Sequence, residues 1–519
     1  MRLRPDNSLR CFFERKRVLI IVPHQDDELF LCGTIIGLLK GDYQNVFVAF
    51  TTNGDYGCSF DMRRKESISA LGVYGIKSTN IFFLGYGDQY NTEYGHLYHA
   101  PVGSVVSSKA GYQSTYGDVF CMRTEGRHHD YTIENYSDDF ENIIKHIFPD
   151  VIFCNDLDWH PEHRITSLVF DKVLGKILKE VNNYHPYVFK GFVYYLGWDG
   201  VIDYKKKNLD RTKRPNRYHS ADKRFEFGNP YFKWKERICF PVDYRLTLKK
   251  RNVLYKAIHQ YHFSDNAMRF YDSMMNSDAI FWERSTIDYA VQASIIISSG
   301  CSKYLNDFVI IDSSNITKKN NMPFDESIWR ADEWDKEPEI KLVFDKPIDA
   351  HEIVLYRDID SYSCECSNTD IIVTCDENGV NKILRFDGVI EKFDVKKIYR
   401  INTKKIESIM IRMHNNRIGL SEIEVNRHQS LKFIKILVNN NFAYEYYVDE
   451  DCKELSVDYY TYGCSKNKLV KNVLYTYPKS EDVIWEDEQI IMTKKLKKCI
   501  LKISLEDQPE IYDVVCLRR

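Results

Sequence analysis

Residues 17–22 read RVLIIV, a short apolar run rich in β-branched side chains, and the polar block PHQDDE follows at once at 23–28. An apolar run of this length is typical of a strand buried on both faces of a parallel sheet. Three further runs of this kind lie at residues 45–51, 80–85 and 150–155. Longer stretches suited to helices separate them, at residues 29–40, 63–74 and 138–148. This alternation predicts an α/β domain with a doubly wound, mostly parallel sheet.

Polar residues cluster at the carboxyl end of the first predicted strand, where sheets of this kind bind their ligands. PHQDDE places His24, Asp26, Asp27 and Glu28 directly after an apolar strand, where uncompensated charges are costly. A divalent cation would offset these charges, and an imidazole beside a carboxylate suits zinc. Adjacent residues on a strand-to-helix turn point in different directions. Asp26 and Asp27 are therefore expected to divide into one metal ligand and one base.

A second polar cluster follows the strand predicted at 150–155. A catalytic zinc ion normally has three protein ligands and one open position, so a further ligand is expected after another strand. Residues 156–163 read DLDWHPEH and place His160 and His163 at such a strand end. A lone histidine is more often a hydrogen-bonded core or surface residue. Two clusters at equivalent ends of neighbouring strands favour a shared metal site instead.

The two clusters resemble those of a known family, the zinc deacetylases of the GlcNAc-phosphatidylinositol de-N-acetylase type, also called LmbE-like. The family has a P-H-x-D-D-E block and an H-P-D-H block, and this chain has PHQDDE and HPEH. The features between the blocks keep the family's order: TTNGDYG at 51–57, Arg63 with Glu66, FLGYGD at 83–88 and STYGD at 114–118. The resemblance covers about residues 15–285. It implies a Rossmann-like fold and a metal-dependent hydrolase that acts on a linear amide.

The resemblance also implies roles for individual residues. His24, Asp27 and His163 correspond to the ligands of one zinc ion per chain, although a site of this composition accepts other divalent ions. Asp26 corresponds to the general base that takes a proton from the attacking water. His160 corresponds to the histidine that assists the tetrahedral intermediate and the leaving group.

Other positions correspond to substrate contacts or depart from the family pattern. Arg63 and Asp88 align with residues that contact substrate in relatives. Gln25 stands in place of a proline and Glu162 in place of an aspartate, and both changes are expected to be mild. Asp158 stands where some members have a tyrosine that polarises the carbonyl. The groups that stabilise the oxyanion are therefore expected to differ from those members.

From about residue 290 the pattern changes to short strands separated by polar turns, which predicts a β-sandwich. Two of these strands are predicted at 339–345 and 352–358. Residues 289–428 resemble a discoidin-like, galactose-binding-like domain of the coagulation factor 5/8 type C. The residues that carry this resemblance are YLND at 304–307, Trp329, Trp334, EIKLVFD at 339–345 and GLSEIEV at 419–425.

These patterns predict three domains: a deacetylase domain over 1–288, the sandwich over 289–428, and a small β-rich domain over 429–519. The last of these is predicted only to be β-rich, with an immunoglobulin-like fold left open, so one or two β-sandwich domains are expected. Some discoidin-like domains bind glycans, whereas a tryptophan between strands is more often a core residue. Sugar binding by the sandwich is therefore left open.

Composition excludes several classes of protein. A net charge of −3 over 519 residues gives no general attraction to nucleic acid, so no such partner is expected. No apolar run approaches the roughly 18 residues of a transmembrane helix, and the first residues lack the apolar stretch of a secretory signal. The 14 cysteines include no CxxC pair and are expected to be reduced thiols. A cytoplasmic location is expected, and the oligomeric state is left open.

The sequence therefore predicts a zinc-dependent N-deacetylase. Its substrate is expected to be an N-acetylated sugar of the GlcNAc or GalNAc type, or a glycan that contains one, and its products an amino sugar and acetate. One alternative keeps zinc amidase chemistry on a non-sugar amide. Another is a glycan-binding scaffold with a silent deacetylase domain, but the chain retains every expected ligand and the base.

Overall fold

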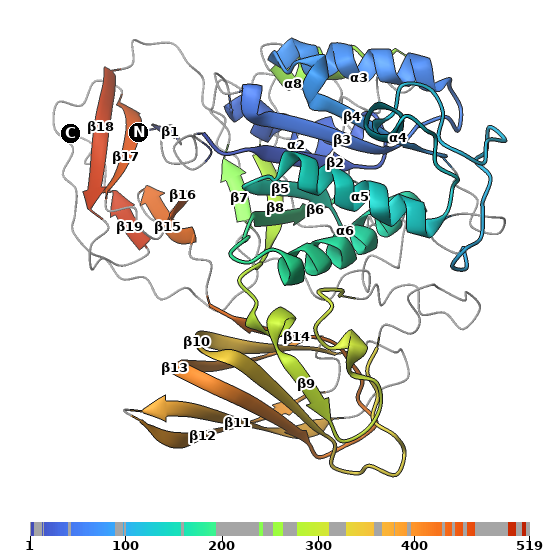
Figure 1. Cartoon of the computed structure of the whole chain (residues 1–519). Coiled ribbons are helices and arrows are strands. Elements are labelled where there is room, and N and C mark those ends of the chain that lie inside the picture. Colours follow the sequence, from blue (N-terminus) through green and yellow to red (C-terminus); the bar gives the residue numbers. More distant parts are fainter. Residues whose placement is uncertain are drawn as a thin grey trace.

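The computed structural model contains an α/β domain, an antiparallel β domain and two small three-stranded sheets (Figure 1). The structure describes residues 2–4, 13, 15–39, 43–88, 97, 100–156, 160–193, 238–241, 253–262, 278–310, 328–357, 366–377, 379–391, 396–427, 431–438, 442–449, 454–461, 497–504 and 511–514.

A seven-stranded mixed sheet forms the centre of the α/β domain, in the strand order β4-β3-β2-β5-β6-β8-β7. The first five strands in this order are parallel to one another, whereas β8 is antiparallel to β6 and β7 is antiparallel to β8. Their bounds are β2 (Val18–Val22), β3 (Val46–Thr52), β4 (Ile81–Tyr86), β5 (Val151–Asn155), β6 (Tyr187–Gly191), β7 (Ile238–Pro241) and β8 (Asp278–Arg284). The predicted doubly wound, mostly parallel sheet is confirmed.

The sheet is covered on both faces, which explains why its strands are uniformly apolar. In β2, Val18, Ile20 and Val22 pack into one hydrophobic core, while Leu19 and Ile21 pack into the other. The first core includes side chains of α2 (Asp27–Leu38), α3 (Phe60–Tyr74) and α8 (Val253–Ile258). The second includes side chains of α4 (Phe120–Glu125), α5 (Ile133–Ile147) and α6 (Pro161–Glu180).

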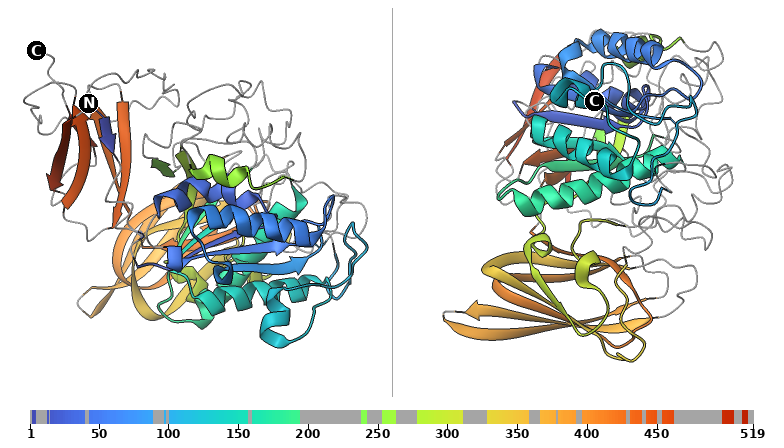
Figure 2. Two further views of the ribbon diagram at one scale, coloured as in Figure 1. Left: turned by 90° about the horizontal axis from the view of Figure 1, so that it is seen from above. Right: turned by 45° about the vertical axis from the view of Figure 1, so that its right-hand side comes forward.

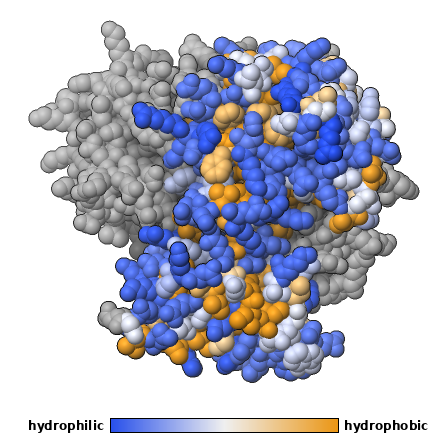
Figure 3. All heavy atoms as spheres, viewed as in Figure 1, coloured by the Kyte–Doolittle hydropathy of each residue, from blue (hydrophilic) through white to orange (hydrophobic). Residues whose placement is uncertain are grey.

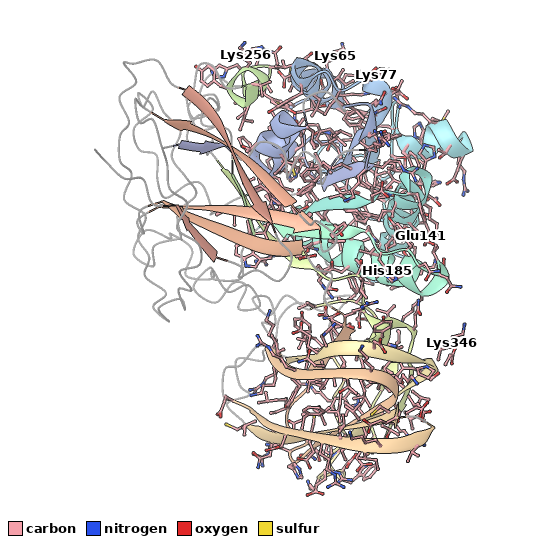
Figure 4. All side chains as sticks on the ribbon, turned by 90° about the vertical axis from the view of Figure 1, so that its left-hand side faces the viewer. Lys65, Lys77, Glu141, His185, Lys256 and Lys346 are labelled. Atoms are coloured by element: carbon pink, nitrogen blue, oxygen red, sulfur yellow. The ribbon has the colours of Figure 1, made fainter. Side chains whose placement is uncertain are left out.

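The outer sides of the covering helices are polar. Lys65 of α3 and Lys256 of α8 lie on the outward side of their layer, and Glu141 lies on α5 (Figure 4). Hydrophilic residues cover most of the visible face of the α/β domain (Figure 3). An apolar area lies lower in this view, on the β domain near β9, where Ile296 is exposed. Among the described helices, none is both long enough and apolar enough to span a membrane.

An antiparallel β domain follows, with the strand order β12-β11-β13-β10-β14 and β9 paired with β10. We call it the sandwich. Its strands are β9 (Ser294–Ile297), β10 (Glu339–Arg357), β11 (Ser367–Glu377), β12 (Val380–Ile390), β13 (Lys396–Met413) and β14 (Leu420–Asn426). The prediction of separate strands at 339–345 and 352–358 is wrong, because residues 339–345 and 352–357 lie in the single strand β10; residue 358 lies outside the described residues. Register shifts between Val343 and Glu352 carry this strand past Pro347, and proline is tolerated at such bulges.

The two tryptophans that carry the sandwich resemblance lie in different environments. Trp329 is fully buried in the core, and its Nε1–H donates to the Ser299 carbonyl at 3.0 Å. Trp334 is exposed, and its Nε1–H donates to Asp332 at 3.1 Å. Trp329 is therefore a core residue.

The remaining described strands form two three-stranded sheets beside the α/β domain (Figure 2). One contains β15 (Leu431–Val438), β16 (Phe442–Asp449) and β19 (Ile511–Val514). The other contains β17 (Glu454–Thr461), β18 (Lys497–Ser504) and, from the start of the chain, β1 (Arg2–Arg4). The domain limits at 288 and 428 stay predictions, and residues 2–4 lie with the C-terminal strands rather than with the α/β sheet.

Candidate metal centre

The turn between β2 and α2 carries the PHQDDE block and has an unusual backbone. Asp26 adopts φ 124° and ψ −31°, a backbone conformation that residues other than glycine rarely adopt. Its backbone N–H donates to Glu28 Oε2 at 2.8 Å, and Glu28 Oε1 accepts from the Tyr261 hydroxyl at 2.7 Å. Burial raises the pKa of Glu28 to about 8. Tyr261, which follows α8, therefore fixes the turn that aims Asp26.

The HPEH block starts α6 and lies at the end of β5. His160 is the N-cap residue, its Nδ1 accepts from the backbone N–H of Glu162 at 3.4 Å, and Pro161 is the first helical residue. Asn155 at the end of β5 donates to the carbonyl of His163 at 2.8 Å, which ties the strand to the first turn of the helix. Asp158 lies outside the described residues.

The three predicted ligands converge in a buried cluster. His24 Nδ1 and Asp27 Oδ2 lie 3.0 Å apart, His163 Nε2 and Asp27 Oδ2 lie 3.2 Å apart, and the two imidazole nitrogens lie 3.3 Å apart. A tetrahedral zinc ion with bonds of about 2.0–2.1 Å separates its ligands by roughly 3.3 Å. Asp27 Oδ1 is buried, and within the described part of the chain it has no hydrogen-bond partner. The donor set and its spacing fit one divalent ion.

The far nitrogen of His24 contacts Glu162, a carboxylate for which the sequence predicted no role in the site. His24 Nε2 lies 2.7 Å from Glu162 Oε2 and 3.8 Å from Asp88 Oδ1. A carboxylate on the second nitrogen fixes the tautomer of a metal-binding histidine and raises its basicity. Glu162 is the third residue of HPEH, so its motif could have pointed to this role. By sequence alone, Glu162 stands out only as a mild replacement of aspartate.

The charges of the cluster shift the pKa values of its members. Burial raises the pKa of Asp27, but the neighbouring His163 and His24 outweigh it and hold that pKa well below the usual range. Burial lowers the pKa of His24, but Asp88 and Asp27 outweigh it and raise that pKa well above the usual range. Burial and the nearby His24 hold the pKa of His160 well below its usual value.

The structure brings the remaining predicted residues to the same place. Arg63 in the first turn of α3 is buried, and its Nη1 lies 3.6 Å from Asp26 Oδ2. Asp88 follows β4 and is buried as well, and burial together with Glu162 raises its pKa to about 8. The His160 ring centroid lies 4.7 Å from that of His24 and 5.0 Å from that of His163. All seven predicted site residues therefore meet at the carboxyl ends of β2, β3, β4 and β5.

The described residues offer other groupings of metal-binding atoms. His160 with His24 and His163 is one, and His24 with Asp88 and Glu162 is another, both within the same site. A third grouping, Cys121 with His129 and Asp139, lies apart from it on α4, α5 and the segment between them. There the ring nitrogens of His129 lie 3.1 Å from a carboxylate oxygen of Glu125 and 3.0 Å from one of Asp139, and Asp139 also accepts from the Tyr86 hydroxyl at 2.7 Å.

Comparisons with known proteins find similarity to parts of the chain. A search of the curated proteins finds no match. Among solved structures, N,N'-diacetylchitobiose deacetylase from Pyrococcus horikoshii is 20% identical over 37% of this chain and 66% of its own, with a TM-score of 0.24.

Two carbohydrate-binding modules are similar to a further part of the chain. The lectin domain of lectinolysin is 14% identical over 27% of this chain and 96% of its own, with a TM-score of 0.20. The family 32 module of NanJ from Clostridium perfringens is 13% identical over 26% and 95%, with a TM-score of 0.19. Residues 19–174 match the family described as PIG-L, GlcNAc-PI de-N-acetylase, and this segment of the chain is a domain of that family.

Proposed function

We propose that the α/β domain is a zinc-dependent N-deacetylase that hydrolyses the acetamide of an N-acetylated sugar to an amino sugar and acetate. The observation that carries this proposal is the set of three donor atoms, on His24, Asp27 and His163, with mutual distances of 3.0, 3.2 and 3.3 Å. The family match over residues 19–174 supports de-N-acetylation as the reaction.

His24, Asp27 and His163 would hold one divalent ion per chain, with zinc the choice that two imidazoles and a carboxylate favour. Such an ion supplies a Lewis acid for the amide carbonyl and lowers the pKa of water. Glu162 orients His24 through its far nitrogen, at 2.7 Å. The protein itself supplies the proton transfers and the positioning of the sugar.

Asp26 is the proposed base. Its carboxylate is partly accessible, and Arg63 Nη1 lies 3.6 Å from its Oδ2, an ion pair that helps to orient it. It accepts the proton of the attacking water and can return a proton to the leaving nitrogen.

His160 is the proposed donor to the oxyanion. Its Nδ1 lies 3.4 Å from both the backbone nitrogen and Oε2 of Glu162. The proposed role requires the tautomer in which the neutral ring carries its proton on Nε2. A neutral imidazole N–H can stabilise the oxygen that gains negative charge in the transition state. Arg63 and Asp88 are proposed to hydrogen-bond sugar hydroxyls.

Acetate release from N-acetylated sugars, and from non-sugar acetamides as a second panel, tests the proposal. Asp26→Asn should keep the bound metal and lose turnover by on the order of 10²–10⁴-fold, the usual contribution of a general base. His163→Ala should lose both metal and turnover, and a chelator should abolish wild-type turnover until zinc is restored. Full activity in the Asp26→Asn protein would refute the assignment. Preference for the second panel would favour the non-sugar amidase, and bound metal without turnover on either panel would favour the glycan-binding scaffold.

A further inference from the structure

Tyrosine side chains gather on one side of the candidate metal centre. Tyr56 and Tyr112 are exposed at 44% and 47%, and Tyr116 is partly buried. Tyr56 lies after β3, whereas Tyr112 and Tyr116 belong to the segment between β4 and α4, on the right of Figure 1. Single exposed aromatics are ordinary on protein surfaces, but a group of them around one polar site suggests a binding surface.

Hydrogen bonds connect this group to the candidate substrate contact Asp88. The Tyr116 hydroxyl donates to Asp55 Oδ2 at 3.0 Å, and Asp55 Oδ1 accepts from the backbone N–H of Asp88 at 2.9 Å. The backbone N–H of Lys109 donates to the Asp88 carbonyl at 3.1 Å. Asp88 in turn lies 3.8 Å from His24. We call Tyr56, Tyr112 and Tyr116 the tyrosine surface. These contacts place it next to Asp88, at the edge of the proposed sugar site.

The surface is also held in place before any ligand binds. The rings of Tyr112 and Tyr116 stack with centroids 4.0 Å apart and planes 22° apart, and Phe60 packs edge-on behind Tyr116 at 5.7 Å. The backbone N–H of Ser108 donates to the Tyr112 carbonyl at 2.8 Å, and Ser108 Oγ accepts from Tyr112 N–H at 3.2 Å. A stacked, hydrogen-bonded aromatic pair loses little conformational entropy when a ligand covers it.

A pyranose ring is the ligand that such a surface suits. Each face of the ring presents C–H groups and its rim presents hydroxyls, so it matches an aromatic face beside polar groups. The Lys109 ammonium, 5.0 Å from the Tyr56 ring centroid, adds a donor at the edge.

We propose that Tyr112, supported by Tyr116, forms a subsite for the sugar ring next to the N-acetylated one. This inference rests on the proposed function and narrows its substrate class: the substrate is an oligosaccharide or polysaccharide rather than a single sugar.

The test compares N-acetylglucosamine with triacetylchitotriose on the full-length, zinc-loaded protein. Binding is measured by calorimetry in the Asp26→Asn background, and kcat/KM is measured by acetate release in the wild-type background. The trimer should be preferred by about tenfold, the size of one good aromatic contact. Tyr112→Ala should abolish this preference, Tyr112→Phe should keep it, and Val102→Ala, an exposed change on the same segment, should keep it too.

Equal affinity for the two sugars, or a preference that survives in Tyr112→Ala, would overturn the subsite while acetate release still supported the proposed function. Conversely, a Tyr112-dependent preference in binding without acetate release from either sugar would support the subsite and refute the deacetylase. Measuring binding and acetate release separately therefore distinguishes failure of the subsite proposal from failure of the proposed deacetylase function.

Discussion

Arg284 at the end of β8 joins the α/β domain to the sandwich, and its replacement by alanine is the most direct test of that joint. Its Nε lies 3.2 Å from Glu424 Oε1 in β14, and its Nη1 lies 3.2 Å from Asp171 Oδ2 in α6. Its Nη2 donates to the Phe308 carbonyl at 2.8 Å. The side chain is only 7% exposed. One guanidinium thus bridges a strand of the sandwich and a helix of the α/β domain.

The loss of folding stability in Arg284→Ala depends on the contacts that Asp171 and Glu424 retain. Asp171 retains Lys190 at 2.9 Å, and Glu424 retains the Tyr356 hydroxyl at 3.0 Å. Removing one partner of a buried ion pair costs about 3–5 kcal/mol, and these retained contacts place Arg284→Ala near the lower end, at about 3 kcal/mol. At roughly 2–4 °C per kcal/mol, the melting temperature should fall by about 6–12 °C.

Arg412→Ala is the matched control. Arg412 also pairs with a glutamate, Glu339 at 2.6 Å, but both side chains are more than a third exposed. Such surface pairs contribute at most about 1 kcal/mol, so this variant should melt within about 4 °C of the wild type. Differential scanning calorimetry of the full chain measures both. Equal melting temperatures for Arg284→Ala and Arg412→Ala would refute the view that Arg284 anchors the joint.

Two further predictions concern buried carboxyl groups. Burial raises the pKa of Glu283 from 4.5 to about 8, so the folded protein holds a proton there that the unfolded chain releases. Stability should therefore fall between about pH 4.5 and 8, and Glu283→Gln should raise the melting temperature at about pH 9 but not at pH 5; parallel melting curves across pH would contradict this. Tyr261→Phe removes the hydroxyl that holds Glu28 and should lower kcat roughly threefold to tenfold with unchanged metal content. An unchanged kcat would show that the Asp26 turn does not need this contact.

The strands and helices that could be predicted from the sequence are those with a clear local pattern of apolar residues. Parallel strands buried on both faces are apolar throughout, so 17–22 was recognisable as a strand, and β2 spans Val18–Val22. Because these strands are parallel, the polar residues that follow each strand lie at the same edge of the sheet. Helix starts were less predictable: the helix expected at 138–148 begins at Ile133, because Thr132 caps it by accepting from Asn135 N–H.

Contacts between distant segments account for what the sequence could not predict. Tyr261 meets Glu28 across 233 positions, and no local spacing foretells which residue of a late segment fills that place. Asp55 is a similar case, since it links Tyr116 to Asp88 and lies within a motif noted only for its order. The PHQDDE and HPEH motifs predicted the residues of the metal centre itself. The residues that support them, such as Tyr261 and Asp55, became apparent only from the fold.

The fold also helps to set the protonation states that a metal ion requires. Asp27 is the first residue of α2, where the N-terminal end of the helix dipole favours a negative charge. His160 caps α6, where the same dipole disfavours a cationic imidazole, and burial together with the nearby His24 holds its pKa well below the usual value. His24 precedes α2; burial lowers its pKa, but Asp88 and Asp27 outweigh burial and raise that pKa well above the usual range. A proton on the coordinating nitrogen competes with the metal, because a ligand imidazole must be neutral at that nitrogen. Glu162, which contacts the far nitrogen of His24 at 2.7 Å, is placed to influence this competition.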